Sequence, residues 1–326
     1  MSRSAVPPPV TAVLEAADSW LPARLAEVER RLAELAVGHG PELGEDAEAT
    51  LTAGGKRLRP LLVLISAGAP AGDRAVPAAV AVELVHMATL VHDDVLDGAP
   101  VRRGRPTVVA RSGREAAVGV GDLLFSRAFA ELAEREGGAE VGELSSASVA
   151  LALGELAQRR DAYDTSIGEE RYLARCALKT ARLFESACRV GRLASQAPGS
   201  DELAAFGREI GLAFQLLDDV LDVTGPTERT GKTRGTDPLD GTVTLPLILA
   251  MRADPTLVGL ELRGLDAAGA EAICDRIAAT GVLDEVRDRA RTGIERAKAV
   301  LGSGSFSDQE RRLLSLIADG VVERYS

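Results

Sequence analysis

The chain contains two apolar runs that each lead into the same acidic pentapeptide, and this repetition constrains the fold more than any other feature of the sequence. The first run, 80–91, is followed after one residue by Asp-Asp-Val-Leu-Asp at 93–97, and the second, 210–217, is followed by the same five residues at 218–222. Neither run contains proline or alternates polar with apolar residues. Both therefore predict buried helices rather than strands.

The carboxylates of each pentapeptide share one face of the predicted helix. Asp93 and Asp97 are four residues apart, as are Asp218 and Asp222, so each pair lies one helical turn apart. Like charges at this spacing repel each other, and partial burial strengthens the repulsion. One interpretation is two solvated helix ends. The identical repeat instead favours a hard cation between the carboxylates, such as Mg²⁺ or Mn²⁺ with substrate phosphate oxygens.

A zinc site is not indicated, because the three His and three Cys of the chain share no zinc-ligand spacing. The cysteines are scattered and odd in number, which predicts reduced core residues rather than disulfides. The polar residues His86 and Gln215 precede the two pentapeptides at helical spacing, so each is expected on the carboxylate face.

Basic residues occur in two turn-forming stretches, one before the first apolar run and one directly after the first pentapeptide. Gly-Gly-Lys-Arg-Leu-Arg-Pro at 54–60 places Lys56 and Arg59 about one turn apart, and Arg102 and Arg103 follow Gly-Ala-Pro-Val. Arginine suits planar, bidentate recognition of phosphate. Taken alone, either stretch is also consistent with an exposed basic turn. A lone Lys179 on a helix and Lys232 in a Gly- and Thr-rich loop gain significance only from this context.

The composition predicts an all-α protein that does not bind nucleic acid. Good helix formers dominate, no series of strands and hairpins is visible, and the net charge is −11. A disordered lead-in is expected at 1–10, where three prolines adjoin, and one domain over 11–326. Helices are expected over about 11–37 and 172–191. Neither a signal pattern nor an apolar stretch of about 18 residues is found, so we expect a cytoplasmic protein without a transmembrane segment.

Taken together, these stretches resemble the trans-isoprenyl (polyprenyl) diphosphate synthases, from Gly54 to Pro246. The matching stretches in order are Gly-Gly-Lys-Arg-Leu-Arg-Pro at 54–60, Asp-Asp-Val-Leu-Asp with Arg-Arg-Gly at 93–104, Lys-Thr at 179–180, Phe-Gln-Leu-Leu-Asp-Asp-Val-Leu-Asp at 214–222, Gly-Lys at 231–232 and Thr-Leu-Pro at 244–246. The resemblance implies the isoprenoid synthase fold, a single all-α domain of antiparallel helices around a deep central cavity. It also implies a homodimer.

The resemblance also implies a role for each matching residue. The direct Mg²⁺ ligands would be Asp93, Asp97 and Asp218, with Asp94, Asp219 and Asp222 contacting metal waters or the ligands. The isopentenyl diphosphate site would contain Lys56, Arg59, His86 and Arg103. The allylic diphosphate site would contain Arg102, Lys179, Thr180, Gln215 and Lys232. In place of the lysine usual just before Thr-Leu-Pro, this chain has Thr242.

The implied reaction is a head-to-tail condensation of isopentenyl diphosphate with an allylic prenyl diphosphate. Metal-assisted loss of diphosphate gives an allylic cation, the isopentenyl double bond attacks it, and a proton is lost. In this family, residues four and five positions before the first aspartate form the floor of the product cavity. Here they are the small residues Thr89 and Ala88, which resembles long-chain bacterial members.

Three other functions are considered beside a long-chain synthase. A short-chain synthase making farnesyl or geranylgeranyl diphosphate would share the reaction and differ in its cavity floor. A class I terpene cyclase would not need Lys56, Arg59 and Arg103 for a second diphosphate. A non-catalytic subunit of a heteromeric synthase is expected to have lost acidic residues that are intact here, and it would be inactive when purified alone.

Overall fold

The computed structural model describes residues 8–36, 41–52, 55, 57–102, 104–133, 138–225, 234–303 and 306–323. Three residues of the predicted site, Lys56, Arg103 and Lys232, lie outside the described residues. The predicted lead-in lies outside them for residues 1–7, but residues 8–10 are helical, so that prediction extended three residues too far.

The described chain is built almost wholly from helices, which confirms the all-α prediction. The α-helices are α1 Pro8–Ala16, α2 Trp20–Ala36, α3 Pro41–Thr52, α4 Leu58–Ala67, α5 Ala75–Asp97, α6 Val108–Ala133, α7 Ala139–Asp161, α8 Glu169–Cys176, α9 Arg182–Ser195, α10 Ser200–Thr224, α12 Thr236–Leu239, α13 Leu245–Ala253, α14 Ala267–Ala279, α15 Val282–Ser303 and α16 Asp308–Glu323. Short 3₁₀ helices are η1 Ala69–Arg74 and η3 Pro255–Leu257, and η2 Ala177–Ala181 is a π-helical turn. Strands β1 Val101–Arg102 and β2 Arg105–Pro106 form an antiparallel hairpin.

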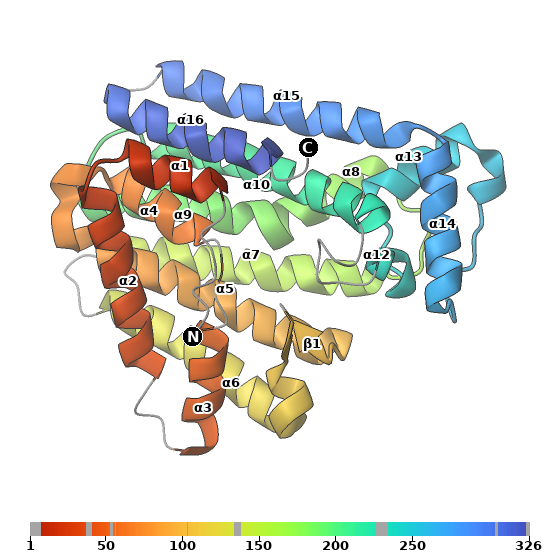
Figure 1. The fold of residues 1–326 in the computed structure, drawn as a ribbon, viewed down its shortest axis with the longest axis horizontal. Helices are drawn as coiled ribbons and strands as arrows, with labels where there is room; N and C mark the ends of the chain where they lie inside the picture. The colour runs from red at the N-terminus through yellow and green to blue at the C-terminus, as the bar shows by residue number, and fades with distance from the viewer. Residues whose placement is uncertain are drawn as a thin grey trace.

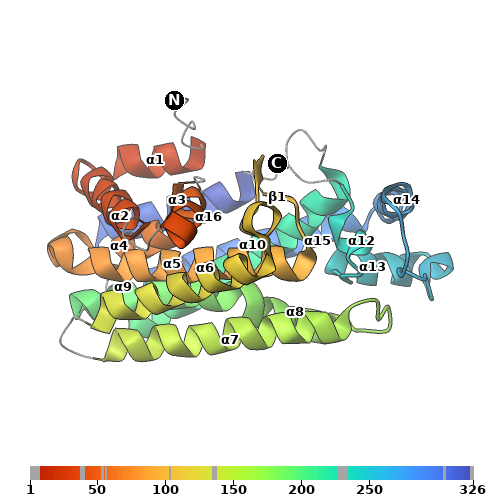
Figure 2. The ribbon, with the colours of Figure 1, turned by 90° about the horizontal axis from the view of Figure 1, so that it is seen from below.

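The long helices pack side by side in layers (Figures 1 and 2). In the centre, α9 packs against both α4 and α10, and α5 packs against α4 and α6. On one side α10 is covered by α15, and on the other α9 is covered by α7. The first described helix, α1, packs against the last, α16. Residues distant in the sequence therefore meet around α5, α9 and α10.

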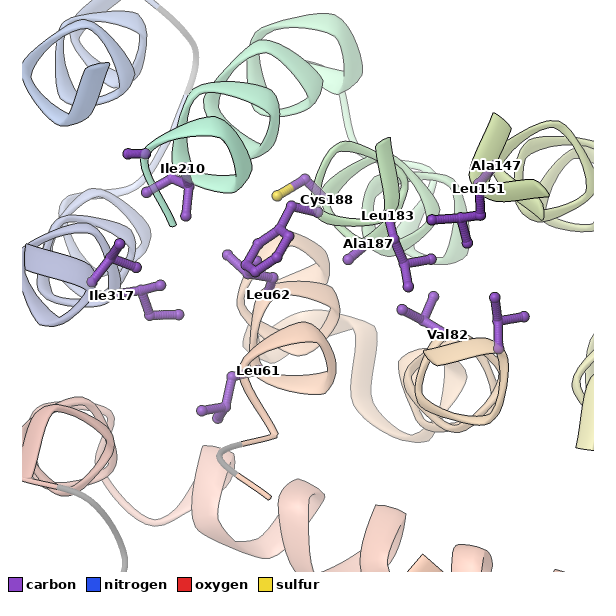
Figure 3. Packing of buried hydrophobic residues seen from close by; sticks show 14 of the residues in the cluster. Leu61, Leu62, Val82, Ala147, Leu151, Leu183, Ala187, Cys188, Ile210 and Ile317 are labelled. Atoms are coloured by element: carbon purple, nitrogen blue, oxygen red, sulfur yellow. The ribbon is translucent and has the colours of Figure 1, made fainter. Parts of the chain in front are cut away.

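The core lies where α4, α5, α9 and α10 meet (Figure 3). Leu62 of α4, Val82 of α5 and Leu183 of α9 are among its buried side chains, and their neighbours come from α7 and α16. Burial of such aliphatic side chains is the main stabilising contribution to a bundle of this kind. The three cysteines are free and buried, as predicted from their scattered positions.

The segment Ala69–Asp97, which ends in α5, is long and apolar enough to cross a membrane by length and composition. The expectation that the chain contains no such stretch was therefore wrong. In the structure, however, 72% of its apolar window is buried inside the protein. The central position of α5 against α4 and α6 accounts for this composition, because a helix enclosed by other helices is apolar on most of its faces.

Two predicted continuous helices are interrupted. The helix expected over 11–37 is divided into α1 and α2 by a turn in which Asp18 adopts φ 55°, a left-handed conformation that an aspartate tolerates better than most residues. The helix expected over 172–191 contains the π-helical turn η2 between α8 and α9. Hydrophobic periodicity does not reveal either break, because apolar residues recur at helical spacing on both sides of each break.

Candidate active site

The first acidic motif occupies the last turn of α5. Gly98 follows it in a left-handed conformation (φ 60°), and its N–H donates to the carbonyl of Asp94, which ends the helix directly after the motif. Asp94 is buried, Asp93 is half-buried, and the side chain of Asp97 is 31% exposed. The motif thus passes from the core to the surface within one turn.

Arginines from two other elements bind this motif. Arg102 in β1 donates from Nε to Oδ1 of Asp94 at 2.7 Å, and Arg159 of α7 donates to Asp97. Burial raises the pKa of Asp93 to about 6; nearby Lys179 opposes this rise, and Glu155 and Asp97 add to it. The first motif therefore lies among alternating positive and negative side chains.

The second acidic motif occupies the last turns of α10 and has mainly neutral hydrogen-bond donors. The hydroxyl of Tyr172 donates to Oδ2 of Asp219 at 2.5 Å, and the amide of Gln215 donates to Oδ1 at 2.7 Å. Burial raises the pKa of Asp219, and these two hydrogen bonds oppose that rise. Asp222 accepts the backbone N–H groups of Thr236 at 3.1 Å and Asp237 at 3.0 Å, so it positions the start of α12.

The π-helical turn η2 connects the two motifs. Thr180 donates from Oγ1 to Oε1 of Gln215 at 2.7 Å, and Gln215 in turn bonds Asp219. The adjacent Lys179 donates to Glu155 of α7 and lies close enough to Asp93 to affect its pKa. The structure therefore brings the predicted Lys179, Thr180 and Gln215 together between the motifs. π-helical turns are rare and frequently occur at functional sites.

Two glycines allow the neighbouring helices to approach this turn. A Cβ on Gly154 of α7 would lie 2.5 Å from the backbone N of Lys179, and a Cβ on Gly211 of α10 would lie 2.5 Å from Cα of Ala181. Both distances are far below van der Waals contact, so only glycine fits. Glycine inside a helix is otherwise destabilising relative to alanine. Its presence at these positions was a signal in the sequence for close packing at η2.

The Gly-Gly-Lys-Arg-Leu-Arg-Pro stretch is anchored by Arg57, which sequence reasoning did not single out. Arg57 directly precedes α4, adopts a left-handed conformation (φ 47°) and is buried. It donates to Oε1 of Glu83 at 2.7 Å, to Oε1 of Glu29 at 2.6 Å and to the carbonyl of Leu51 at 2.9 Å. This middle arginine therefore fixes the stretch to α2, α3 and α5.

A cavity of about 200 Å³ lies beside the first motif, between α3, α5, the hairpin and α6. Asp94, Arg102, Arg105 and Arg111 contribute its charged lining, and Met87 is among its apolar residues. Among the residues that the structure describes, the other predicted substrate residues do not line it. The guanidinium of Arg59 lies over the ring of Phe184 at 4.4 Å, His86 is half-buried with its carbonyl bonded by Thr89, and Ala88 is fully buried.

The donor chemistry of the two motifs fits a hard divalent cation. Their ligand atoms are all carboxylate oxygens, and Asp94 and Asp97 are each bound by a cationic side chain in the structure. Within the described residues, no group of three His, Cys, Asp or Glu side chains forms a ready metal site. A Mg²⁺ or Mn²⁺ ion here would therefore take further oxygens from substrate phosphate and water, as Mg²⁺ commonly does.

Sequence reasoning missed three residues that contact this site: Tyr172, Glu155 and Arg159. Glu155 and Arg159 are four residues apart on α7, a spacing typical of helical ion pairs. The sequence does not show which helix α7 faces, so this spacing alone gave no reason to connect the pair with Asp97 or Lys179.

Comparison with known proteins places the chain in a family. Residues 41–265 match the sequence profile of the polyprenyl synthetases. Heptaprenyl diphosphate synthase component 2 of Geobacillus stearothermophilus is 42% identical over 73% of this chain and 76% of that protein. Geranylgeranyl diphosphate synthase of Methanosarcina mazei is 35% identical over 92% of this chain and 96% of that protein.

A solved structure supports the same assignment. The polyprenyl synthase of Caulobacter crescentus, in complex with calcium and isoprenyl diphosphate, superimposes with a TM-score of 0.88 at 33% identity and covers 100% of both chains. The predicted isoprenoid synthase fold is thus confirmed, and the family uses a divalent metal. The chain belongs to the polyprenyl synthetase family and is an enzyme of the trans-prenyltransferase class.

Proposed function

We propose that the chain condenses isopentenyl diphosphate head-to-tail with an allylic prenyl diphosphate and releases a long-chain polyprenyl diphosphate. The allylic C–O bond breaks, and diphosphate leaves with the electron pair. The isopentenyl double bond then forms the new C–C bond, and a proton passes to the departing diphosphate. No nucleophilic serine or cysteine with a histidine partner is needed for this sequence of steps, and positioning and electrostatic stabilisation supply most of the rate enhancement.

The roles of the side chains follow from their chemistry and from the family resemblance. Mg²⁺, for which Mn²⁺ can substitute, would be held by Asp93, Asp97 and Asp218 and would neutralise the leaving diphosphate. The allylic diphosphate would be bound by Arg102, Lys179, Thr180, Gln215 and Lys232. Isopentenyl diphosphate would be bound by Lys56, Arg59, His86 and Arg103. Asp94, Asp219 and Asp222 would orient the metal ligands and their waters.

The observation that supports this proposal most strongly is the connection between the two acidic motifs through η2. Lys179 lies near Asp93, and the next residue, Thr180, is linked through Gln215 to Asp219. A diphosphate held at Lys179 would therefore lie between the two carboxylate groups. This arrangement suits a metal-assisted ionisation in which both motifs contribute.

We propose a product longer than geranylgeranyl diphosphate. Ala88 and Thr89 are small, and relatives include a heptaprenyl diphosphate synthase component, although a geranylgeranyl diphosphate synthase is similar as well. Replacing Ala88 or Thr89 with phenylalanine should shorten the product, and the half-buried Thr89 is the safer position because Ala88 is fully enclosed. An unchanged product from a folded Thr89→Phe enzyme would show that the cavity floor lies elsewhere.

The direct test is chain-length analysis of the products from the purified chain with farnesyl diphosphate, labelled isopentenyl diphosphate and Mg²⁺. A ladder that ends in a long prenyl product supports the whole proposal. A product that ends at geranylgeranyl diphosphate or below keeps the reaction and assigns a short-chain synthase. If no linear product forms and a cyclic hydrocarbon appears instead, the result would favour a terpene cyclase. If activity appears only when a second chain is added, the result would favour a non-catalytic subunit.

We also propose that the chain from α1 onward acts as one domain, as a homodimer and in the cytoplasm. The packing of α1 against α16 supports a single domain, because it joins the two ends of the described chain. Analytical ultracentrifugation of the purified protein tests the dimer, and a species of monomer mass at micromolar concentration would contradict it.

A further inference from the structure

Four charged side chains form a continuous line from the first acidic motif to η2. Arg159 donates to Asp97 and also to Oε1 of Glu155, at 2.8 Å, and Lys179 donates to the other oxygen of Glu155. The charges alternate along the line Asp97, Arg159, Glu155, Lys179, so each internal member has two partners of opposite sign. Glu155 and Arg159 both belong to α7 and have no role in the reaction proposed above.

The two internal members differ in exposure: Glu155 is largely buried, and Arg159 lies at the surface. The Glu155 side chain is 15% exposed and that of Arg159 is 39% exposed. Burial would raise the pKa of Glu155, but Lys179 and Arg159 together lower it below its ordinary value. Glu155 is therefore a carboxylate at neutral pH. It needs a cation beside it whenever it remains in this position.

Both outer members have other proposed ligands. A divalent cation at Asp97 would compete with the guanidinium of Arg159 for the same carboxylate and would repel it. A diphosphate at Lys179 would compete with Glu155 for the same ammonium group and would likewise repel it. Because Glu155 and Arg159 already bond each other, both could give up their outer partners at once and remain a neutral pair on α7.

We propose that Glu155 and Arg159 form an exchange pair that couples divalent-cation binding at Asp97 to diphosphate binding at Lys179. When the cation binds Asp97, Arg159 is released to Glu155 and neutralises it more fully. The ion pair between Glu155 and Lys179 is thereby weakened. When diphosphate takes Lys179, Glu155 draws Arg159 away from Asp97. The coupling is reciprocal, as linkage between two ligands requires. This inference rests on the roles of Asp97 and Lys179 in the proposed function.

The first test is a titration of the purified full chain with Mn²⁺ alone, followed by electron paramagnetic resonance of free Mn²⁺. Arg159→Gln removes the competing cation, so Mn²⁺ should bind about three- to tenfold more tightly, a range set by the modest strength of a partly exposed ion pair. Arg160→Gln is the matched control, because it removes the same charge from the next residue of α7, which is exposed. Equal affinities in the two variants would overturn the proposal.

The second test measures the coupling with inorganic pyrophosphate present. In the unmodified chain, pyrophosphate should increase the affinity for Mn²⁺. In Arg159→Gln, the ratio of Mn²⁺ affinities with and without pyrophosphate should be about three- to tenfold smaller than in the unmodified chain. Glu155→Gln should bring a similar reduction, because the link to Lys179 is removed. A tightening equal to that of the unmodified chain in both variants would contradict an exchange pair. Arg159→Lys keeps the charge but does not bridge two carboxylates, so its tightening by pyrophosphate should lie between those of the unmodified chain and Arg159→Gln.

One further variant separates this inference from the proposed function. If Asp97→Asn leaves Mn²⁺ binding unchanged, the proposed metal role of Asp97 fails, and the exchange pair fails with it. If Asp97→Asn weakens Mn²⁺ binding while Arg159→Gln behaves like Arg160→Gln, only the exchange pair is overturned. Thermal melting of each variant shows whether it is folded.

Discussion

The two acidic motifs have identical sequences but different partners. In the first motif, Asp94 and Asp97 are bound by Arg102 and Arg159, long cationic side chains from the hairpin and from α7. In the second motif, Asp219 is bound by neutral side chains, and Asp222 accepts backbone N–H groups at the start of α12. Asp219 and Asp222 therefore have neutral hydrogen-bond donors where Asp94 and Asp97 have cationic ones, while Arg175 also acts electrostatically on Asp219.

The difference indicates that the motifs contribute in different ways. A metal ion can displace the cationic partners of the first motif from their carboxylates, because it is also positively charged. The displaced side chains can then bind a diphosphate, because it is negatively charged. The hydroxyl, amide and backbone donors of Asp219 and Asp222 hold the geometry of the second motif and carry no charge themselves. We infer that the second motif is pre-organised, whereas the first is assembled as its ligands bind.

The largest expected effect comes from removing one carboxylate of either motif that is proposed to bind the metal. Asp93→Asn and Asp218→Asn should each lower kcat by on the order of 10²–10³, because one group that stabilises the leaving diphosphate is lost. The measurement is the steady-state rate at saturating Mg²⁺. Asp288→Asn, an exposed residue of α15, is the control and should keep full activity. A loss confined to one motif would contradict a joint role.

The next effect is on the turn between the motifs. Gly154→Ala would force its Cβ against the backbone of Lys179, 2.5 Å away, and overpacking of this kind typically costs about 1–3 kcal/mol of unfolding free energy. Gly142→Ala on the same helix is the matched control, since its Cβ would meet nothing within 4 Å. Urea denaturation should show Gly154→Ala less stable and Gly142→Ala equally or more stable. Equal effects would show that η2 does not require this close approach.

A smaller pair of effects compares the supports of the two motifs directly. Tyr172→Phe leaves the buried Asp219 without one donor and should lower the unfolding free energy by about 1–2 kcal/mol. Arg102→Gln removes a partly exposed arginine from the buried Asp94 and should lower the unfolding free energy by under about 1 kcal/mol. Its main effect should be a higher KM for the allylic diphosphate. Greater destabilisation by Arg102→Gln would reverse the distinction between a pre-organised and an exchangeable motif.

The smallest expected effect is the pH dependence of the stability that the ion pairs of Glu155 contribute. The pKa of Glu155 is lowered from 4.5 in the folded protein, because Lys179 and Arg159 outweigh its burial. Its stabilisation is therefore present above about pH 4.5 and is lost as the pH falls through the lowered value. Glu155→Gln should be less stable than the unmodified chain by about 1 kcal/mol or less at pH 7, and this difference should shrink as the pH falls below 4.5, as measured by denaturation. A difference that does not shrink as the pH falls would point to a packing effect.

The fold class and much of the site were predictable from the sequence. The apolar runs predicted buried helices, and the repeated pentapeptide predicted two related carboxylate groups; both are in the structure. Local pattern carries this information because helical spacing fixes which side chains share a face. The order of Lys179, Thr180 and Gln215 along the matching stretches also predicted that they belong to one site.

The remaining features depend on contacts between distant helices. Tyr172 and Glu155 could not be assigned, because their partners Asp219 and Lys179 lie 47 and 24 residues away. The π-helical turn was missed since its hydrophobic pattern is that of an ordinary helix. The apolar length of α5 was underestimated, because the predicted apolar run covered only 80–91, whereas the apolar helix extends further and is packed into the core.

The most direct test of the difference between the motifs is a crystal structure of the chain with Mn²⁺ and a non-ionisable allylic diphosphate analogue, with anomalous scattering to locate the metal. We predict Mn²⁺ on Asp93 and Asp97 and on Asp218, with Arg159 withdrawn from Asp97 onto Glu155. Asp222 should still accept the N–H groups of Thr236 and Asp237, and Tyr172 should still bond Asp219. Metal on only one motif, or Arg159 still bound to Asp97 beside a metal, would contradict the account.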